Sequence, residues 1–167
     1  MIEKIVGASN RFERGYQDDP NWRNKFAHKM HKVAELVTQN AIMNNKEFCP
    51  ICIFVNTNSY MVVPVGEFLK TPEGKDQLAQ ELHDAARLKQ EIIGIILIVD
   101  VWMRTNENDP NPEDAIFTNA QWRDGSDLSI ITKYVKKSDI EFEFKSPEVP
   151  VYDMQCGRLS NFFIKQQ

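Results

Sequence analysis

The chain has 167 residues, of which 42% are apolar and 26% charged, and its formal net charge is −4. This length predicts a single globular domain over residues 1–167, whose core needs no metal or disulfide support, with residues 1–18 as an irregular N-terminal arm. The acidic balance argues against a general phosphate-binding surface, so nucleic acid is not an expected partner.

The sequence also predicts where the protein resides. Its longest apolar run, Ile92–Val99, is far shorter than the roughly 20 residues of a membrane helix. The N-terminus lacks the apolar stretch of a signal peptide, and three cysteines are an odd number, which argues against a secreted disulfide framework. We therefore expect a soluble protein in the cytoplasm, without membrane contact.

The strongest helical pattern follows Asp19-Pro20, a pair suited to the start of a helix. Apolar side chains then recur at spacings of three and four, and Asn44-Asn45 suits a left-handed stop. The stripe predicted to face inward consists of Trp22, Phe26, Met30, Val33 and Val37, widened by Ala27, Ala34 and Ala41.

A hairpin is predicted next, because the apolar runs Phe48–Val55 and Tyr60–Val65 flank the turn residues Asn56–Ser59. Thr71–Gly74 then interrupts the chain, and residues 75–91 have the spacing of a second helix. Its predicted inward residues are Leu78, Leu82 and Ala85 or Ala86.

The remaining pattern is typical of strands. Ile92–Met103 is apolar at both parities, which predicts a central strand covered on both sides over its first half. Leu128–Val135 follows the turn at Asp124-Gly125, and Ile140, Phe142 and Phe144 alternate with charged residues. Short connections favour antiparallel pairing. The predicted fold class is α+β: a mostly antiparallel sheet of about five to six strands, packed with two main helices as a two-layer sandwich.

Cys49 and Cys52 have the two-residue spacing of zinc sites and redox centres. In an extended strand, positions three apart point to opposite faces, which would separate the sulfurs. Zinc would need two further ligands, for which only Cys156 and a histidine are available. We expect two buried apolar thiols and no cofactor, with zinc as the alternative.

The histidines offer a weaker metal pattern. His28 and His31 are three residues apart on the first helix, so both can face one side. Lys29 and Lys32 flank them, and their charge opposes cation binding. The predicted environment of this pair is a solvated helix face.

Asp100 is the best candidate for a general acid, because it shares the parity of Ile98 and Trp102, and burial would raise its pKa. No nucleophile or base accompanies it in sequence. The interpretation we favour is an acid that marks where the strand reaches water, or that pairs with Arg104.

Two functions remain, because no nucleotide, hydrolase or metalloprotease motif is present. The first is a non-catalytic binding or assembly protein that self-associates as a homodimer or larger assembly through its sheet edge. The alternative is a metal-binding or hydrolytic enzyme, with Asp100 and Arg104, or Cys49 and Cys52 with a histidine, as its site. The expected contact surfaces are a basic helix face for an acidic partner (Arg23, Lys25, Lys29 and Lys32), the segment Phe117–Trp122, and the C-terminal "NFFIK".

Overall fold

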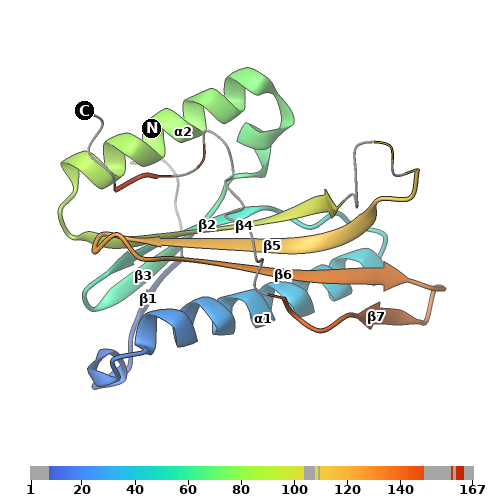
Figure 1. Ribbon diagram of the computed structural model, residues 1–167, viewed down its shortest axis with the longest axis horizontal. Coiled ribbons are helices and arrows are strands. Elements are labelled where there is room, and N and C mark those ends of the chain that lie inside the picture. The colour runs from blue at the N-terminus through green and yellow to red at the C-terminus, as the bar shows by residue number, and fades with distance from the viewer. Residues whose placement is uncertain (1–7, 104–107, 109, 149–158, 160, 164–167) are drawn as a thin grey trace.

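The computed structural model describes residues 8–103, 108, 110–148, 159 and 161–163. In this part of the chain, seven antiparallel strands form one sheet in the order β1-β3-β2-β4-β5-β6-β7, and one long helix lies on each face (Figure 1). The strands are β1 (Ala8–Arg11), β2 (Ile51–Asn56), β3 (Ser59–Pro64), β4 (Ile92–Met103), β5 (Glu113–Trp122), β6 (Asp127–Lys136) and β7 (Phe142–Phe144). The helices are α1 (Trp22–Met43) and α2 (Pro72–Leu88), with short 3-10 turns η2 (Tyr16–Asp18) and η3 (Gly66–Lys70).

The α+β class with a mostly antiparallel sheet is confirmed, but two details differ from the expectation. The sheet has seven strands rather than five or six, and the helices cover opposite faces, which makes three layers rather than two. The residues of β4 explain the layers. Ile96 and Ile98 belong to the core under α1, whereas Ile95 and Leu97 belong to the core under α2.

The central strand lies where the sequence placed it. β4 is fourth of the seven strands, pairs with β2 on one side and β5 on the other, and is buried over its first half. The β2–β3 hairpin is also confirmed. Gly125 turns the chain between β5 and β6 with φ 91°, a left-handed conformation that suits glycine, and its N–H donates to the Trp122 carbonyl at 3.0 Å.

α1 differs from the prediction in the face that it buries. Val33 and Val37, which were expected to face inward, are exposed. Of the rest of the predicted stripe, Trp22, Phe26, Met30 and Ala34 are buried as expected. The buried residues recur every four positions, and each step advances about 40° beyond a full turn, so the contact line winds around the helix. That line runs through Trp22, Phe26, Met30, Ala34 and Thr38.

α2 buries the face that its apolar spacing predicted. The Thr71 hydroxyl caps its first turn by accepting a hydrogen bond from the Gly74 N–H at 3.0 Å, and Pro72 occupies the first helical position. The side chains that it turns toward the sheet include Leu78, Leu82, Ala85 and Ala86.

The N-terminal arm expected over residues 1–18 is not wholly irregular. Ala8–Arg11 form β1 and pair with β3, and residues 1–7 lie outside the described part of the chain. Phe12 anchors the chain that follows, because its ring lies 5.2 Å from the Tyr16 ring and 5.0 Å from the Phe26 ring. These aromatic contacts hold a polar segment against α1.

Among the described residues, no helix combines the length and the apolar character that crossing a lipid bilayer requires.

Gly94 provides a test of the packing under α1. It pairs with Trp122 across β4 and β5, and a Cβ added to Gly94 would lie 2.3 Å from two atoms of the Trp122 ring. We expect Gly94→Ala to lower the free energy of unfolding by about 1–3 kcal/mol through overpacking, measured by urea denaturation. Gly66→Ala is the control, since its nearest neighbour would lie at 3.3 Å. An unchanged midpoint for Gly94→Ala would contradict this packing.

Candidate functional site

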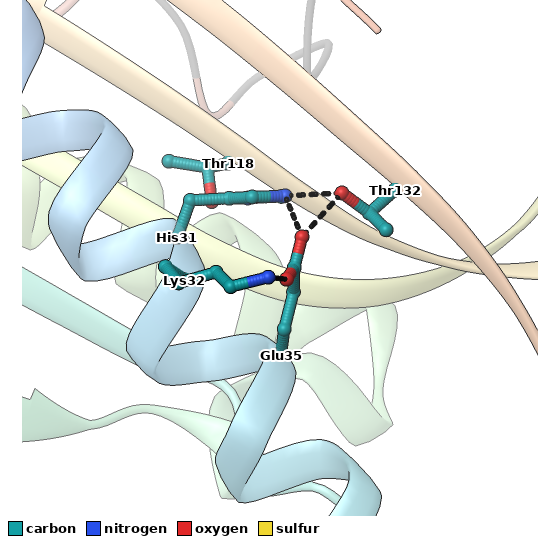
Figure 2. A network of polar contacts seen from close by, with 5 residues as sticks. All are labelled: His31, Lys32, Glu35, Thr118 and Thr132. Atoms are coloured by element: carbon teal, nitrogen blue, oxygen red, sulfur yellow. Dashed lines mark hydrogen bonds and ion pairs between the residues drawn. The ribbon is translucent and has the colours of Figure 1, made fainter. Parts of the chain in front are cut away.

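A network of buried polar side chains joins α1 to the sheet (Figure 2). His31 and Glu35 lie four residues apart on the inward side of α1, Thr118 lies on β5 and Thr132 on β6. No more than 2% of any of these four residues is exposed. Lys32 reaches the network from the surface of α1. Polar groups buried this deeply need partners, and each of the four has one.

The protons available at each atom assign a direction to each hydrogen bond. Glu35, as the carboxylate paired with Lys32 at 2.8 Å, accepts from the Thr132 hydroxyl, whose oxygen lies 2.8 Å from Oε1. The Thr132 hydroxyl has one proton, so His31 Nε2–H donates to Thr132 at 2.7 Å. A neutral imidazole then accepts at Nδ1 from the Thr118 hydroxyl, also at 2.7 Å. The network therefore holds His31 as its neutral Nε2–H tautomer.

Burial lowers the pKa of His31 from 6.5 to about 4. The negative charge of Glu35 opposes this shift, while the nearby His28 and Lys32 add to it. His31 is consequently uncharged at neutral pH, which agrees with the tautomer that its hydrogen bonds require.

The chemistry available to this network is limited by burial. A hydroxyl that donates to a neutral imidazole is a pattern found at activated nucleophiles. Thr118, however, has no exposed surface, so a substrate has no access to its hydroxyl in this structure. The network instead fixes the rotation and the height of α1 on β5 and β6, as satisfied buried polar groups do.

His31 lies on the buried side of α1, and the prediction of a solvated environment for it is wrong. His28 is exposed, as expected, whereas His31 is buried, so the two histidines do not share a solvated face. The sequence does contain a pattern that indicates the buried side. His31 and Glu35 are four residues apart, and they share a helix face with the small residues Ala27, Ala34 and Thr38. The apolar stripe through Val33 and Val37 concealed it.

The two candidate cysteines lie in different environments. The extended strand predicted over Phe48–Val55 is confirmed from Ile51 onward, and Cys49 precedes it. Cys52 is fully buried in the core under α2, where burial raises the pKa of its thiol. Cys49 is exposed, so the expectation of two buried thiols is wrong for this residue, which precedes the strand; both thiols are free. Cys156 lies outside the described residues.

Asp100 lies on the α1 side of β4, near Glu47 and Asp114. Partial desolvation raises the pKa of its carboxyl, and the two neighbouring negative charges add to the shift. Arg104, its predicted partner, lies outside the described residues. Within the part of the chain that the structure describes, no group of three or more His, Cys, Asp or Glu side chains could hold a metal ion.

The basic residues of α1 are largely paired within the chain. Arg23 lies 3.3 Å from Asp124, Lys25 pairs with Asp19, and Lys32 with Glu35. Lys29 lies over the Tyr16 ring at 5.9 Å and has no carboxylate partner among the described residues. An acidic partner at this face stays a prediction, and it would compete with three internal ion pairs.

One of the expected contact surfaces is buried, and another has a buried residue at its centre. Phe117–Trp122 lie in β5, where Phe117 is 3% and Trp122 2% exposed. Phe162 of the "NFFIK" segment belongs to the core under α2. The apolar surface lies elsewhere: Val33, Leu36 and Val37 are 43%, 59% and 51% exposed and form one stripe along α1, which we call the α1 outer face.

Comparison of the chain with models of known protein families, with curated proteins and with solved structures finds no match.

The hydroxyl of Thr132 should contribute to stability, whereas that of Thr38 should not. Both residues are fully buried, but Thr132 bridges His31 and Glu35, and the Thr38 hydroxyl has no hydrogen-bond partner in the described structure. We expect Thr132→Val to lower the free energy of unfolding by about 1–3 kcal/mol, because two buried groups lose a partner. Thr38→Val, its matched control, should be neutral or slightly stabilising. Equal losses in urea denaturation would contradict the network.

His31 should make stability depend on pH. Its pKa of about 4 in the folded chain lies below the ordinary 6.5, so the unfolded chain binds this proton more readily. The contribution of neutral His31 to the free energy of unfolding is therefore complete above pH 6.5. It is lost as pH falls toward 4, at up to about 1.4 kcal/mol per pH unit.

The measurement compares the free energy of unfolding of the wild type, His31→Gln and His28→Gln between pH 7 and pH 4. The advantage of the wild type over His31→Gln should shrink as pH falls. His28→Gln should follow the wild type, because His28 is exposed. A constant gap between the wild type and His31→Gln would refute a neutral buried imidazole.

Proposed function

We propose that the protein is a small binding and assembly protein that acts through protein–protein contacts and does not catalyse a reaction. Its contact surface is the α1 outer face, and its first partner is a second copy of the chain. The free thiols of Cys49 and Cys52 support a reducing compartment, such as the cytoplasm, as the place of action.

The observation that carries this proposal is the polarity of α1, which is reversed over its second half. His31 and Glu35 are buried, while Val33, Leu36 and Val37 are exposed on the other side. Burying a histidine and a carboxylate is costly unless every group is paired, and neighbouring exposed apolar side chains on one helix face suit contact with another protein. The hydrogen bonds to Thr118 and Thr132 account for the buried pair, and a second protein surface that covers the α1 outer face would account for the exposed apolar side chains.

A second copy suits this surface because the charge along α1 is uneven. In the first half of the helix Lys29 has no carboxylate partner among the described residues, whereas Glu47 follows the C-terminal end of α1 and lies near Asp100. Two α1 helices that pack antiparallel would bring the basic half of each copy toward the acidic end of the other. With 22 residues, α1 is about 33 Å long, enough to form the central ridge of such an interface.

The sheet edges are weaker candidates than this helix. Within the described chain, the edge strands β1 and β7 span four and three residues, and beyond β7 Glu148 still pairs with Ile131 of β6. Pro64, at the end of β3, has no N–H to donate to an added strand. Short edges and proline both discourage strand addition, so these features support assembly through α1 rather than through the edge expected from the sequence.

Leu36→Asp should disrupt the dimer. A charge at the centre of the α1 outer face would be desolvated in the interface, and we expect the dissociation constant of the dimer to rise about 10–100-fold. Light scattering over a concentration series would measure this change.

Leu88→Asp is the matched control, since Leu88 on α2 is 68% exposed and lies outside the α1 outer face. This variant should dimerise like the wild type. A wild-type chain that stays monomeric at high micromolar concentration would contradict self-association. Equal effects of the two variants would contradict the choice of surface.

A further inference from the structure

The described residues of the C-terminal stretch are held to the domain by contacts with side chains. These residues, Leu159 and Asn161–Phe163, lie between α2 and the sheet (Figure 1, red). Gln121 of β5 contacts the main chain at both ends of this stretch. Its Oε1 accepts from the Phe162 N–H at 3.1 Å, and its Nε2 lies 3.4 Å from the Leu159 carbonyl oxygen.

The Gln121 amide is itself fixed in orientation. Its Nε2 donates to the Asn119 side-chain oxygen at 2.6 Å, and the Asn119 amide donates to the Ser129 hydroxyl at 3.0 Å. Gln121 and Asn119 are buried, with 7% and 5% exposure. An oriented, buried amide that binds both an N–H and a carbonyl recognises a peptide backbone independently of its side chains.

Three side chains of the stretch occupy distinct environments. Leu159 and Phe162 are buried in the core under α2, and the Phe162 ring meets the His83 ring edge-on at 5.1 Å. Phe163 lies 4.9 Å from the Arg123 guanidinium, a cation–π contact. Arg123 is held rigidly by the carbonyls of Ala86, Lys89 and Ile92. Together these contacts select a segment of the pattern Leu-x-x-Phe-Phe.

We propose that this surface of β5 and α2 is a peptide-binding site, that residues 159–163 are its internal ligand, and that it also accepts the same segment from a second copy. The described residues of the stretch belong to no strand of the sheet, and Asn161 has φ 58°, a left-handed conformation that asparagine adopts more readily than most other residues. Its release therefore breaks side-chain contacts without unpairing any strand of the sheet.

The partner we infer for this site is a second copy of the chain, because it carries the same Leu-x-x-Phe-Phe segment that the site already binds. The chain from Glu148 to Leu159 spans residues 149–158, which at full extension could reach up to about 35 Å. The internal segment competes at an effective concentration of about millimolar, so exchange requires a high chain concentration or a weakened internal segment. The site lies on the α2 side of the sheet, opposite the α1 outer face, and exchange there would link α1 dimers into longer assemblies.

The test is complementation between two full-length variants, both carrying Leu36→Asp so that α1 makes no contribution. Phe162→Ala weakens the segment and leaves the site intact, whereas Gln121→Ala weakens the site and leaves the segment intact. Each variant alone should be monomeric by light scattering, and their mixture should form a one-to-one complex. The control is a chain with both Phe162→Ala and Gln121→Ala, mixed with each single variant in turn. Neither mixture contains both an intact site and an intact segment. We therefore expect both mixtures to pair more weakly than the two single variants pair with each other.

A second measurement covers the case in which Phe162→Ala fails to fold. Phe163→Ala is milder, because Phe163 is only partly buried and loses mainly its contact with Arg123. A labelled peptide of residues 157–167 should bind this variant about two- to fivefold more tightly than it binds the wild type, whose own segment competes more strongly. The same peptide with Phe162→Ala should not bind.

Equal binding of the peptide to the wild type and to Phe163→Ala, no binding to either, or a mixture that stays monomeric would overturn the exchange. These outcomes leave the Leu36→Asp comparison in the wild-type chain untouched. Failure of the peptide site is therefore distinguishable from failure of the α1 outer face.

Discussion

The hydrogen-bonded chain from Thr118 through His31 and Thr132 to Glu35 determines how α1 sits on the sheet. Apolar side chains alone allow a helix to rotate or slide with little change in buried area. An oriented polar chain does not, because a shift of one residue would leave a buried imidazole and a buried carboxylate without partners, at a cost of several kcal/mol. The rotation that satisfies this chain is also the one that turns Val33, Leu36 and Val37 outward.

The two faces of the sheet are stabilised in different ways. Under α1, aromatic rings surround the polar chain, and Trp22 and Trp122 meet edge-on at 5.4 Å. Under α2, the contacts are mainly aliphatic, and the C-terminal stretch completes the layer. β4 serves both faces, since alternate side chains along its first half enter each core. The surfaces proposed for binding therefore lie on opposite sides of one shared strand and can act separately.

Much of the fold could be predicted from the sequence, because alternation, turn residues and apolar spacing are local signals. The β2–β3 hairpin, the central strand β4 and the buried face of α2 followed from them. The continuous apolar character of β4 indicated that both faces of the sheet are covered. That pattern requires three layers, although two were expected. The side of α1 could not be predicted in this way, since Thr118 and Thr132, which make burial of His31 favourable, lie on strands distant in sequence. The role of Gln121 escaped for the same reason, because its partners are main-chain groups of residues 159 and 162.

The distance along the chain between α1 and its polar partners also has a kinetic consequence. His31 lies 87 residues before Thr118 and 101 residues before Thr132. The helix is therefore synthesised long before the two strands that accept its histidine exist, and contacts between such remote residues form late because closing a long loop is entropically unfavourable. In the nascent chain α1 exposes apolar side chains on one side and unpaired polar groups on the other. Its final docking must await β6, which makes the helix the segment most exposed to premature association while the ribosome is still translating.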